Sequence, residues 1–539
     1  MTDKSKSKKK KKEKTAQDSQ RKKTEKKSLE LPWRKMGRVW LVGAGPGDPG
    51  LMTCRGREVL AQADVVVYDA LLSPEILAMI PPEAEAIDVG KRANAHKMKQ
   101  KEINHILLDQ AREGRRVVRL KGGDPYLFGR GGEEIAYLAE HEVPCEIVPG
   151  ITSALAVPAC MGIPVTHRED SASVHIFTGH RKKDEPLDLD YEAIAKTGGT
   201  LIFLMSVASL PDICFGLIRG GLSPDTPAGL LERGTMPGQR RILSTLANLP
   251  EEVSRLGAGA PAVLIIGGVC RRSEILACAG QLPLAGCRAI VTRPRGSSSR
   301  LSDLLKERGA QVLEIPAIEV VPRGGAETEE AFTHLDLYDW IAFTSPAGVR
   351  IFFGEMRQRQ LDLRVLGSKK IAVLGPGTAA ELSARGIYPD AMPETYDTAS
   401  LGRLLAGICP PQSCILIPRS ANGSFELTQE LAARPDLVWN DLALYDTIDA
   451  KPNVIDPAAI LREDSIPLVF FTSASTVTGF ASMLPAEEIC TVRALCIGAK
   501  TAAAAERLGM ITWTAEEATP ESLADLAVQV YSAKFDGGQ

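Results

Sequence analysis

The chain has 539 residues, of which 44% are hydrophobic and 24% charged, and its formal net charge is −3. A chain of this length is expected to form three or four domain-sized hydrophobic cores, and its ordinary composition excludes the fibrous and membrane classes of protein. No apolar stretch reaches the roughly 20 residues that a bilayer crossing needs. The eleven cysteines are scattered without a CxxC pair or a His/Cys cluster, so we expect reduced thiols, no metal site and a cytoplasmic protein.

The N-terminus carries a lysine-rich run. Residues 1–30 hold 13 Lys and Arg against 5 Asp and Glu, a net charge of +8, which leaves −11 on the rest of the chain. Such a run is usually a disordered, solvated tail, and we predict that residues 1–35 form one. Attachment to nucleic acid or to an anionic surface is the alternative, although the acidic remainder argues against a nucleic-acid-binding body.

Residues 39–69 predict a strand, a glycine-rich turn, a helix over 51–61 and a second strand. The turn GAGPGD resembles a dinucleotide fingerprint, but Asp48 stands where the third glycine is needed and its carboxylate would repel a pyrophosphate. Pro46 also removes one backbone N–H from the loop. A glycine turn that ends in an acid suits a ligand with cationic or hydroxyl groups, and a dinucleotide-dependent oxidoreductase remains an alternative.

The following elements are expected in alternating α/β order. A short strand leads into a basic loop at 91–101, and a helix at 102–113 precedes strands at 116–120 and 145–148. After residue 171 the pattern changes, with strands expected at 174–177, 200–205 and 262–268. We therefore predict two α/β lobes, at about 36–165 and 170–275, with a ligand bound between them.

Five motifs stand in order along these lobes. They are GAGPGDPGLMT at 43–53, ADVVVYDALLS at 63–73, VGKR at 89–92, LKGGDPYLFGRGGEE at 120–134 and VPGITSALAVPACMGIPVTHR at 148–168. With them the chain resembles the uroporphyrinogen-III C-methyltransferases from about residue 39 to 270. The resemblance implies a two-lobed tetrapyrrole methylase fold, S-adenosyl-L-methionine as methyl donor, S-adenosyl-L-homocysteine as product, and no metal. The donor-binding residues implied are Pro46, Gly122, Gly123, Asp124, Leu127, Thr152, Ser153, Met205 and Gly234.

The same resemblance implies Asp69 as proton acceptor and Lys91 as proton donor. Methylation of a pyrrole carbon is followed by rearrangement of protons around the macrocycle, so a positioned base is chemically sensible. The family's substrate carries eight carboxylates, and Arg92 in the basic loop suits them, although a solvated surface loop is the alternative. A strand-end methionine such as Met205 is by itself more often a core residue.

The second half contains an internal repeat. IAFTSPA at 341–347 recurs as VFFTSAS at 469–475, IAVLGPGTA at 371–379 recurs as ALCIGAKTA at 494–502, and IVTR at 290–293 echoes LIPR at 416–419. Offsets of 128 and 123 residues predict two copies of one α/β unit after a linker at 276–285. Hydroxyls and amides at helix N-termini form an anion site, with ordinary N-capping as the alternative for each Ser or Thr.

This half resembles uroporphyrinogen-III synthase from about 286 to 533, through VTRP, FTSPAGV, LALYDT, FFTSAS and IGAKTAAAAERLG. The resemblance implies that hydroxymethylbilane is closed in a cleft between two duplicated lobes. One lobe is expected to combine about 286–320 with 447–533, and the other to span about 321–446. It implies Tyr445 as the group that assists loss of hydroxide, with interlobe packing as the alternative role. The substrate-binding candidates are Arg293, Thr344, Ser345, Thr472, Ser473 and Thr501.

The two halves are consistent because the product of the second is the substrate of the first. We expect an enzyme that cyclises hydroxymethylbilane to uroporphyrinogen III and methylates it at C-2 and C-7 to give precorrin-2. A methyltransferase whose degenerate synthase half only binds tetrapyrrole is the alternative. The partners expected are these small molecules, with no nucleic acid required and no membrane, and a second copy of the chain that forms a homodimer through the methyltransferase half.

Overall fold

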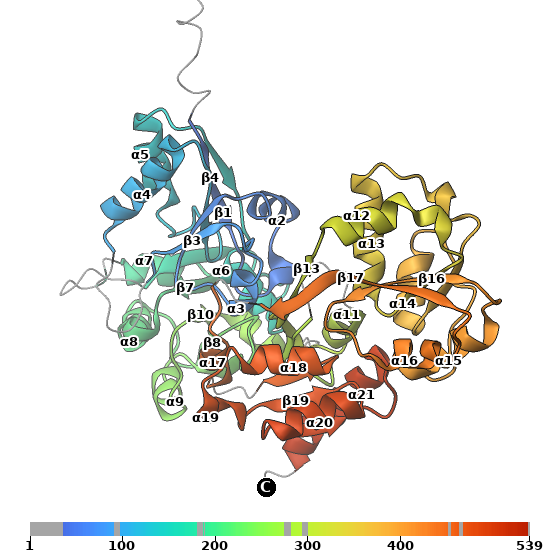
Figure 1. The fold of residues 1–539 in the computed structure, drawn as a ribbon. Coiled ribbons are helices and arrows are strands. Elements are labelled where there is room, and N and C mark those ends of the chain that lie inside the picture. The colour runs from blue at the N-terminus through green and yellow to red at the C-terminus, as the bar shows by residue number, and fades with distance from the viewer. Residues whose placement is uncertain are drawn as a thin grey trace, which may run out of the picture.

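The computed structural model describes residues 36–90, 98–179, 187, 189–273, 282–293, 300–450, 454–462 and 467–536. The tail at 1–35 and the basic loop residues Lys91 and Arg92 lie outside these ranges. Within them, the strands form four five-stranded sheets, two in each half of the chain. Figure 1 shows the N-terminal half from blue to green and the C-terminal half from yellow-green to red.

The first sheet is parallel, with the strand order β3-β2-β4-β1-β5. Helices cover both faces, which explains why its inner strands are continuous apolar runs rather than alternating ones. Its elements are β1 (Arg38–Gly43), α2 (Cys54–Leu60), β2 (Val65–Tyr68), α3 (Pro74–Leu77), β3 (Glu85–Asp88), α4 (Gln100–Arg112), β4 (Arg116–Lys121), α5 (Gly131–Glu140), β5 (Cys145–Val148) and α6 (Ser153–Cys160).

The first helix is shorter than the predicted span of 51–61. A 3-10 turn (η2, Pro49–Leu51) comes first, and Asp48 caps it by accepting a hydrogen bond from the Gly50 amide. Thr53 then caps α2 through the Gly56 amide. Two separate caps within six residues divide the segment, because each fixes a non-helical backbone at its own position.

The second sheet is mixed, with the order β6-β7-β10-β8-β9. The sequence predicted three of its strands and missed the antiparallel hairpin of β8 and β9, which is joined by a tight turn at 233–239. Its elements are β6 (Val174–Thr178), α7 (Tyr191–Lys196), β7 (Thr200–Leu204), α8 (Leu210–Arg219), β8 (Pro227–Glu232), β9 (Arg240–Thr245), α9 (Leu249–Arg255) and β10 (Ala262–Ile266).

The third sheet, β12-β11-β18-β19-β20, is parallel, and the fourth has the order β13-β17-β16-β14-β15. The repeated sequences occupy matching places, since β11, β18 and β19 of one sheet correspond to β16, β14 and β15 of the other. The predicted duplication is confirmed, and β13, antiparallel to β17, is an addition. The strands are β11 (Arg288–Val291), β12 (Gln311–Glu314), β13 (Ile318–Pro322), β14 (Trp340–Phe343), β15 (Lys370–Val373), β16 (Cys414–Ser420), β17 (Val438–Asp449), β18 (Leu468–Phe471), β19 (Arg493–Cys496) and β20 (Ile511–Thr514).

Helices pack on both of these sheets. They are α11 (Arg300–Glu307), α12 (Ala326–Thr333), α13 (Pro346–Gln358), α14 (Pro376–Ser383), α15 (Thr398–Ile408), α16 (Glu426–Ala432), α17 (Pro457–Leu461), α18 (Ala474–Ala481), α19 (Ala486–Ile489), α20 (Ala499–Arg507) and α21 (Pro520–Asp536). Over the ranges that the structure describes, no helix has both the length and the apolar character that crossing a membrane requires.

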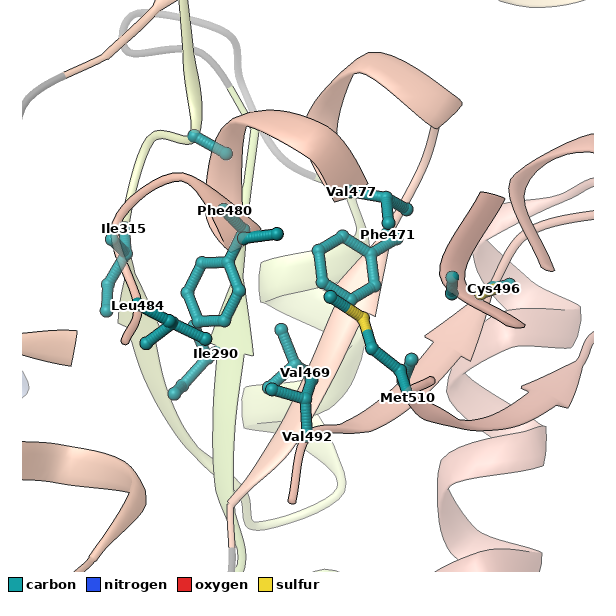
Figure 2. Close-up of a cluster of buried hydrophobic side chains, with 14 of the residues drawn as sticks. Ile290, Ile315, Val469, Phe471, Val477, Phe480, Leu484, Val492, Cys496 and Met510 are labelled. Carbon is teal, nitrogen blue, oxygen red and sulfur yellow. The ribbon is translucent and has the colours of Figure 1, made fainter. Parts of the chain in front are cut away.

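The chain passes between the third and fourth sheets twice, from β12 to β13 and from β17 to β18. The first crossing is anchored in the core of the third sheet, where Ile315 and Ala317 are buried beside α18. Figure 2 shows Phe471 of β18 and Phe480 of α18 in this core, with ring centroids 5.7 Å apart in an edge-to-face arrangement. The core of one sheet therefore fixes the strand that leads into the other.

We expect Phe480→Ala to lower the free energy of unfolding of this lobe by about 3–5 kcal/mol, because the residue is fully buried and its removal leaves a cavity. Urea unfolding followed by circular dichroism measures this change. Phe425→Ala is the matched control, since that ring is 73% exposed, and its loss should leave the unfolding midpoint almost unchanged. Equal effects of the two substitutions would contradict the packing described.

Candidate functional site

Three loops meet at the carboxyl ends of β1, β4 and β5. Gly45 and Gly123 exchange backbone hydrogen bonds, with N···O distances of 3.2 Å from the Gly45 amide and 2.7 Å from the Gly123 amide. A β-carbon on Gly150 would lie 2.2 Å from the Gly123 carbonyl oxygen, and one on Gly43 would lie 2.5 Å from the Gly150 α-carbon. These positions therefore need glycine for close packing of backbone against backbone.

Asp124 holds two of the loops together. One carboxylate oxygen accepts from the Tyr126 and Leu127 amides at 2.8 and 3.2 Å, and the other accepts from the Gly150 amide at 3.0 Å. Thr152 in the third loop caps α6 by accepting from the Ala154 amide. Ser153 begins this helix, and a β-carbon on Gly123 would lie 3.9 Å from its nitrogen. Loops and helix start thus form one continuous surface.

The second lobe reaches these loops through the β8–β9 turn. A β-carbon on Gly234 would lie 2.3 Å from Val157 of α6, so the turn packs directly on that helix. Arg233 and Thr235 on either side have φ of 48° and 67°, a left-handed backbone that costs roughly 1–2 kcal/mol per residue. Strain of this kind persists where the surrounding structure holds it, often at functional sites.

Met205 and Leu127 lie at the margins of this surface. Met205 follows β7, is 51% exposed and has φ of 55°, so the alternative that it is a core residue is wrong. Leu127 is partly buried against the core that contains Ala154 and Val157. Pro46 is partly buried in the first loop. The structure thus brings the Pro46, Gly122–Asp124, Thr152–Ser153 and Gly234 segments together, whereas Met205 stands at a strand end.

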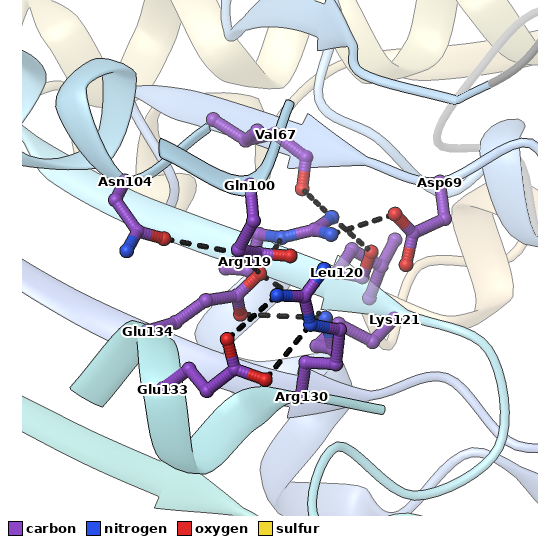
Figure 3. Close-up of polar contacts among 10 residues, drawn as sticks. All are labelled: Val67, Asp69, Gln100, Asn104, Arg119, Leu120, Lys121, Arg130, Glu133 and Glu134. Atoms are coloured by element: carbon purple, nitrogen blue, oxygen red, sulfur yellow. Dashed lines mark hydrogen bonds and ion pairs between the residues drawn. The ribbon is translucent and has the colours of Figure 1, made fainter. Parts of the chain in front are cut away.

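Asp69 belongs to a buried network of charges, drawn in Figure 3. Arg119 donates to Asp69 Oδ1 at 2.6 Å and to Glu134 Oε1 at 3.2 Å, and Lys121 donates to Glu134 at 3.2 Å. The Arg119 and Glu134 side chains are 2% and 0% exposed, whereas that of Asp69 is 28% exposed. Two cations thus balance two carboxylates, of which Glu134 lies away from water and Asp69 is partly exposed, and such pairing is what buried charges require.

Burial lowers the pKa of the Lys121 ammonium, and the positive charge of Arg119 lowers it further. Gln100 from α4 adds a hydrogen bond of 2.9 Å to Glu134. Sequence reasoning missed this network, although Arg119 and Lys121 inside an otherwise apolar strand were a signal for it. Asp69 is the member that reaches solvent, so the network orients one carboxylate at the edge of the site.

In the C-terminal half, Tyr445 and Ser345 lie together. The Tyr445 hydroxyl is 2.8 Å from Ser345 Oγ, and burial raises the pKa of this tyrosine. Ser345 also caps α13 by accepting from the Gly348 amide, and Ser473 caps α18 in the same way through the Thr476 amide. The duplicated Thr-Ser motifs therefore do serve as N-caps. The partly buried Thr344 and Thr472 precede these caps, and Thr501 is buried in the first turn of α20.

Two arginines approach each other between the two lobes of this half. Burial lowers the pKa of Arg293, and the charge of Arg350 on α13 lowers it further. Arg350 is paired with Glu381 at 2.7 Å and lines a cavity of about 340 Å³ that Ile318 and Leu77 also line. Sequence reasoning missed Arg350, which lies on the first helical turns after the FTSPAGV motif. Cations from the two lobes thus lie close enough for one to affect the pKa of the other.

A prediction follows from the loop packing. Gly150→Ala should lower the melting temperature of the N-terminal half by several degrees, because its methyl group would overlap the Gly123 carbonyl. Gly122→Ala is the matched control, since its methyl group would meet only Leu71 at 3.5 Å, an ordinary contact. Calorimetry measures both, and equal melting temperatures would contradict the close approach of the loops.

Comparison with known families gives two adjacent matches. The model for Tetrapyrrole (Corrin/Porphyrin) Methylases matches residues 38–250, and the model for Uroporphyrinogen-III synthase HemD matches residues 299–525. The solved structure of uroporphyrin-III C-methyl transferase from Thermus thermophilus complexed with S-adenyl homocysteine is 40% identical, covers 44% of this chain and 94% of its own, and has a TM-score of 0.38. Both resemblances drawn from the sequence are confirmed.

Two curated relatives extend these matches. The S-adenosyl-L-methionine-dependent uroporphyrinogen III methyltransferase of Methanosarcina barkeri is 49% identical over 44% of this chain and 94% of its own length. The porphyrin biosynthesis protein HemD of Ruminiclostridium josui is 41% identical over 92% of this chain and 98% of its own length, and so spans both halves. The chain therefore belongs to the family of porphyrin biosynthesis proteins in which a tetrapyrrole methylase is joined to a uroporphyrinogen-III synthase.

Proposed function

We propose that this chain performs two consecutive steps of tetrapyrrole biosynthesis. The C-terminal half closes hydroxymethylbilane to uroporphyrinogen III, and the N-terminal half methylates that product at C-2 and C-7 with S-adenosyl-L-methionine, which gives precorrin-2. The observation that carries the proposal is the presence of both family models, one after the other, in a single chain. One half would release what the other consumes.

The donor site we propose is the surface formed by the three glycine loops and the β8–β9 turn. S-adenosyl-L-methionine supplies an activated methyl group, so the protein mainly has to hold the donor in line with its acceptor and exclude water. The space beside Gly122 supports this site, because among the described residues only Leu71 lies within 4 Å of its β-carbon position. The residues proposed are Pro46, Gly122, Gly123, Asp124, Leu127, Thr152, Ser153, Met205 and Gly234.

Asp124 would act through the backbone rather than directly on the donor. Its two carboxylate oxygens already accept three amide hydrogen bonds, which fix the Gly123 and Gly150 loops against each other. Replacing the carboxylate would therefore change the shape of the donor surface. Since these three amide donors occupy both oxygens of this partly buried carboxylate, its role in the site is inseparable from the loop geometry.

Asp69 is the proposed proton acceptor. Arg119 holds one of its oxygens at 2.6 Å, so the carboxylate keeps a fixed orientation at the end of β2. The macrocycle loses a proton after a methyl group joins one of its carbons, and a carboxylate within reach of that position accepts it. The proposed donor Lys91 and the substrate-binding Arg92 lie outside the described residues.

In the synthase half we propose Tyr445 as the proton donor to the departing hydroxide. Burial raises its pKa, so the phenol is protonated at neutral pH although it is a weaker acid, and its contact of 2.8 Å with Ser345 Oγ orients the hydroxyl. Arg293, Thr344, Ser345, Thr472, Ser473 and Thr501 are the proposed substrate-binding residues. Carboxylates of the bilane would offset the opposed charges of Arg293 and Arg350 between the lobes.

Further proposals concern the location, the assembly and the domain bounds of the chain. We propose a cytoplasmic homodimer that needs neither nucleic acid nor a membrane, with the methyltransferase at 36–275 and the synthase at 286–533. The chain would have no resident metal. Size-exclusion chromatography with light scattering measures the oligomeric state.

The central test incubates the purified chain with hydroxymethylbilane and S-adenosyl-L-methionine and follows product masses over time. We expect uroporphyrinogen III first and then products with one and two added methyl groups. Formation of type I uroporphyrinogen alone would remove the synthase assignment and favour a half that only binds tetrapyrrole. Cyclised product without any methylation would remove the methyltransferase assignment.

Tyr445→Phe should lower the rate of type III formation by about 100-fold, because the phenol proton is lost while the ring still fills its place. Tyr388→Phe is the matched control, since that side chain is 77% exposed, and its activity should equal that of the unmodified chain. Chromatographic separation of the type I and type III isomers provides the measurement. An unchanged rate would leave Tyr445 with a packing role only.

Gly122→Leu should weaken S-adenosylhomocysteine binding by more than about tenfold, because a larger side chain would fill the open space beside the loop without disturbing the fold. Gly132→Leu is the control, since its β-carbon position also has open surroundings but lies on α5. Calorimetric titration compares the two. Displacement of S-adenosylhomocysteine by NAD would instead favour the alternative of a dinucleotide-dependent oxidoreductase.

A further inference from the structure

Two contacts between the halves start from one pair of neighbouring residues. Arg288 and Gln311 face each other at the beginning of β11 and β12 in the synthase half. Arg288 Nε donates to Glu75 Oε1 at 3.0 Å, and Gln311 Nε2 donates to the Thr235 carbonyl at 3.4 Å. One end of the synthase sheet thus docks onto two separate segments of the methylase half.

The junction is desolvated. The side chains of Arg288 and Glu75 are 1% and 0% exposed, so their ion pair lies away from water. Apolar side chains pack across the junction in both directions, Ala78 against the core of the third sheet and Val454 against the core of the first. Figure 1 shows the corresponding place of α3 between the two halves. Charged and apolar contacts together fix one half against the other.

Both docked segments contact Gly47. Ser73, the cap of α3, donates to the Gly47 carbonyl at 2.6 Å. From the opposite side, Thr235 Oγ1 and Met236 Cγ lie 3.3 and 2.8 Å from the position of a β-carbon on Gly47. Glu75 stands two residues after Ser73. The synthase sheet therefore reaches the glycine loop by two short routes.

Gly47 is a sensitive point of that loop. Its φ is 143°, and it directly follows Pro46 in the proposed donor site. The buried oxygens Thr235 Oγ1 and Gln311 Oε1 have no hydrogen-bond partner in the described part of the chain, so this contact does not make all the hydrogen bonds that its groups could form. A small shift of β11 and β12 would move the side chains that contact Gly47.

We infer that Arg288 and Gln311 of the synthase half are positioning residues for the methyl-donor loop of the methyltransferase half. They act through α3 and through the β8–β9 turn, which hold Gly47 between them. The inference rests on the proposed donor site. The synthase half would then help to hold the proposed donor site of the methyltransferase half in its shape.

The test uses the full-length chain and S-adenosylhomocysteine. One variant is Gln311→Ala, and the other combines Glu75→Leu with Arg288→Met, which removes the ion pair without leaving one buried charge alone. Arg308→Met is the matched control, because its pair with Asp525 at 2.6 Å lies wholly within the synthase half. Calorimetry gives the dissociation constant, and hydrogen exchange reports the amides of residues 43–49.

We expect the dissociation constant to rise about tenfold in both test variants, with less ligand-induced protection at 43–49, and to stay unchanged in the control. The KM for the donor should rise more than kcat falls, because the donor loop is displaced while the reacting groups are retained. Arg288→Lys, which keeps the charge, should recover part of the affinity.

An unchanged dissociation constant in both test variants would overturn the inference, as would equal weakening in the Arg308→Met control. Absence of binding to the unmodified chain is a different result. It would overturn the proposed donor site itself, and this inference would fall with it.

Discussion

Close approach of backbone at Gly43, Gly123 and Gly150 is the constraint on which the N-terminal half depends. Three strand ends of a parallel sheet converge there, and the space between them admits no β-carbon at Gly43 or Gly150. Because the loops touch through backbone, Asp124 can link two of them with one carboxylate, and α6 can begin directly beside Gly123. The proposed donor surface is thus made chiefly of main chain, whose shape changes little with neighbouring side chains.

Below this surface the charged network has a different role. Arg119 and Glu134 are almost fully buried, and removal of one partner from such a pair costs about 3–5 kcal/mol because the other is left uncompensated. Arg119 and Glu134 each have several partners, and the part-exposed member is Asp69. A carboxylate that must accept a proton gains orientation from this arrangement, since its partner is itself fixed by hydrogen bonds to the Val67 and Leu120 carbonyls.

Much of the fold could be predicted because its signals are local. Continuous apolar runs marked the buried parallel strands, glycine and proline marked the loops, and repeated strings marked the duplicated lobes. The β8–β9 hairpin was missed because Arg240 and Arg241 begin an edge strand whose apolar pattern is weak. The pairing of Arg119 with Glu134 and the position of Arg350 could not be predicted either, since they depend on how distant elements pack. The capping role of Asp48 could not be predicted either, and its carboxylate accepts from the Gly50 amide at the start of a 3-10 turn.

The synthase half shows how duplication gives two lobes with matching strand ends, between which the proposed site lies. Matching strand ends of the third and fourth sheets place a capped helix in each lobe, with Ser345 in one and Ser473 in the other. The two crossings of the chain hold the lobes together, and the positive charge of Arg350 in one lobe acts on the buried Arg293 of the other. Arg350 is also paired with Glu381 at 2.7 Å, which offsets part of the repulsion between the two arginines, and an anionic ligand would offset more of it. The end of α3 of the methylase half lines the cavity beside Arg350, so the helix whose cap contacts Gly47 also borders the junction with the synthase half.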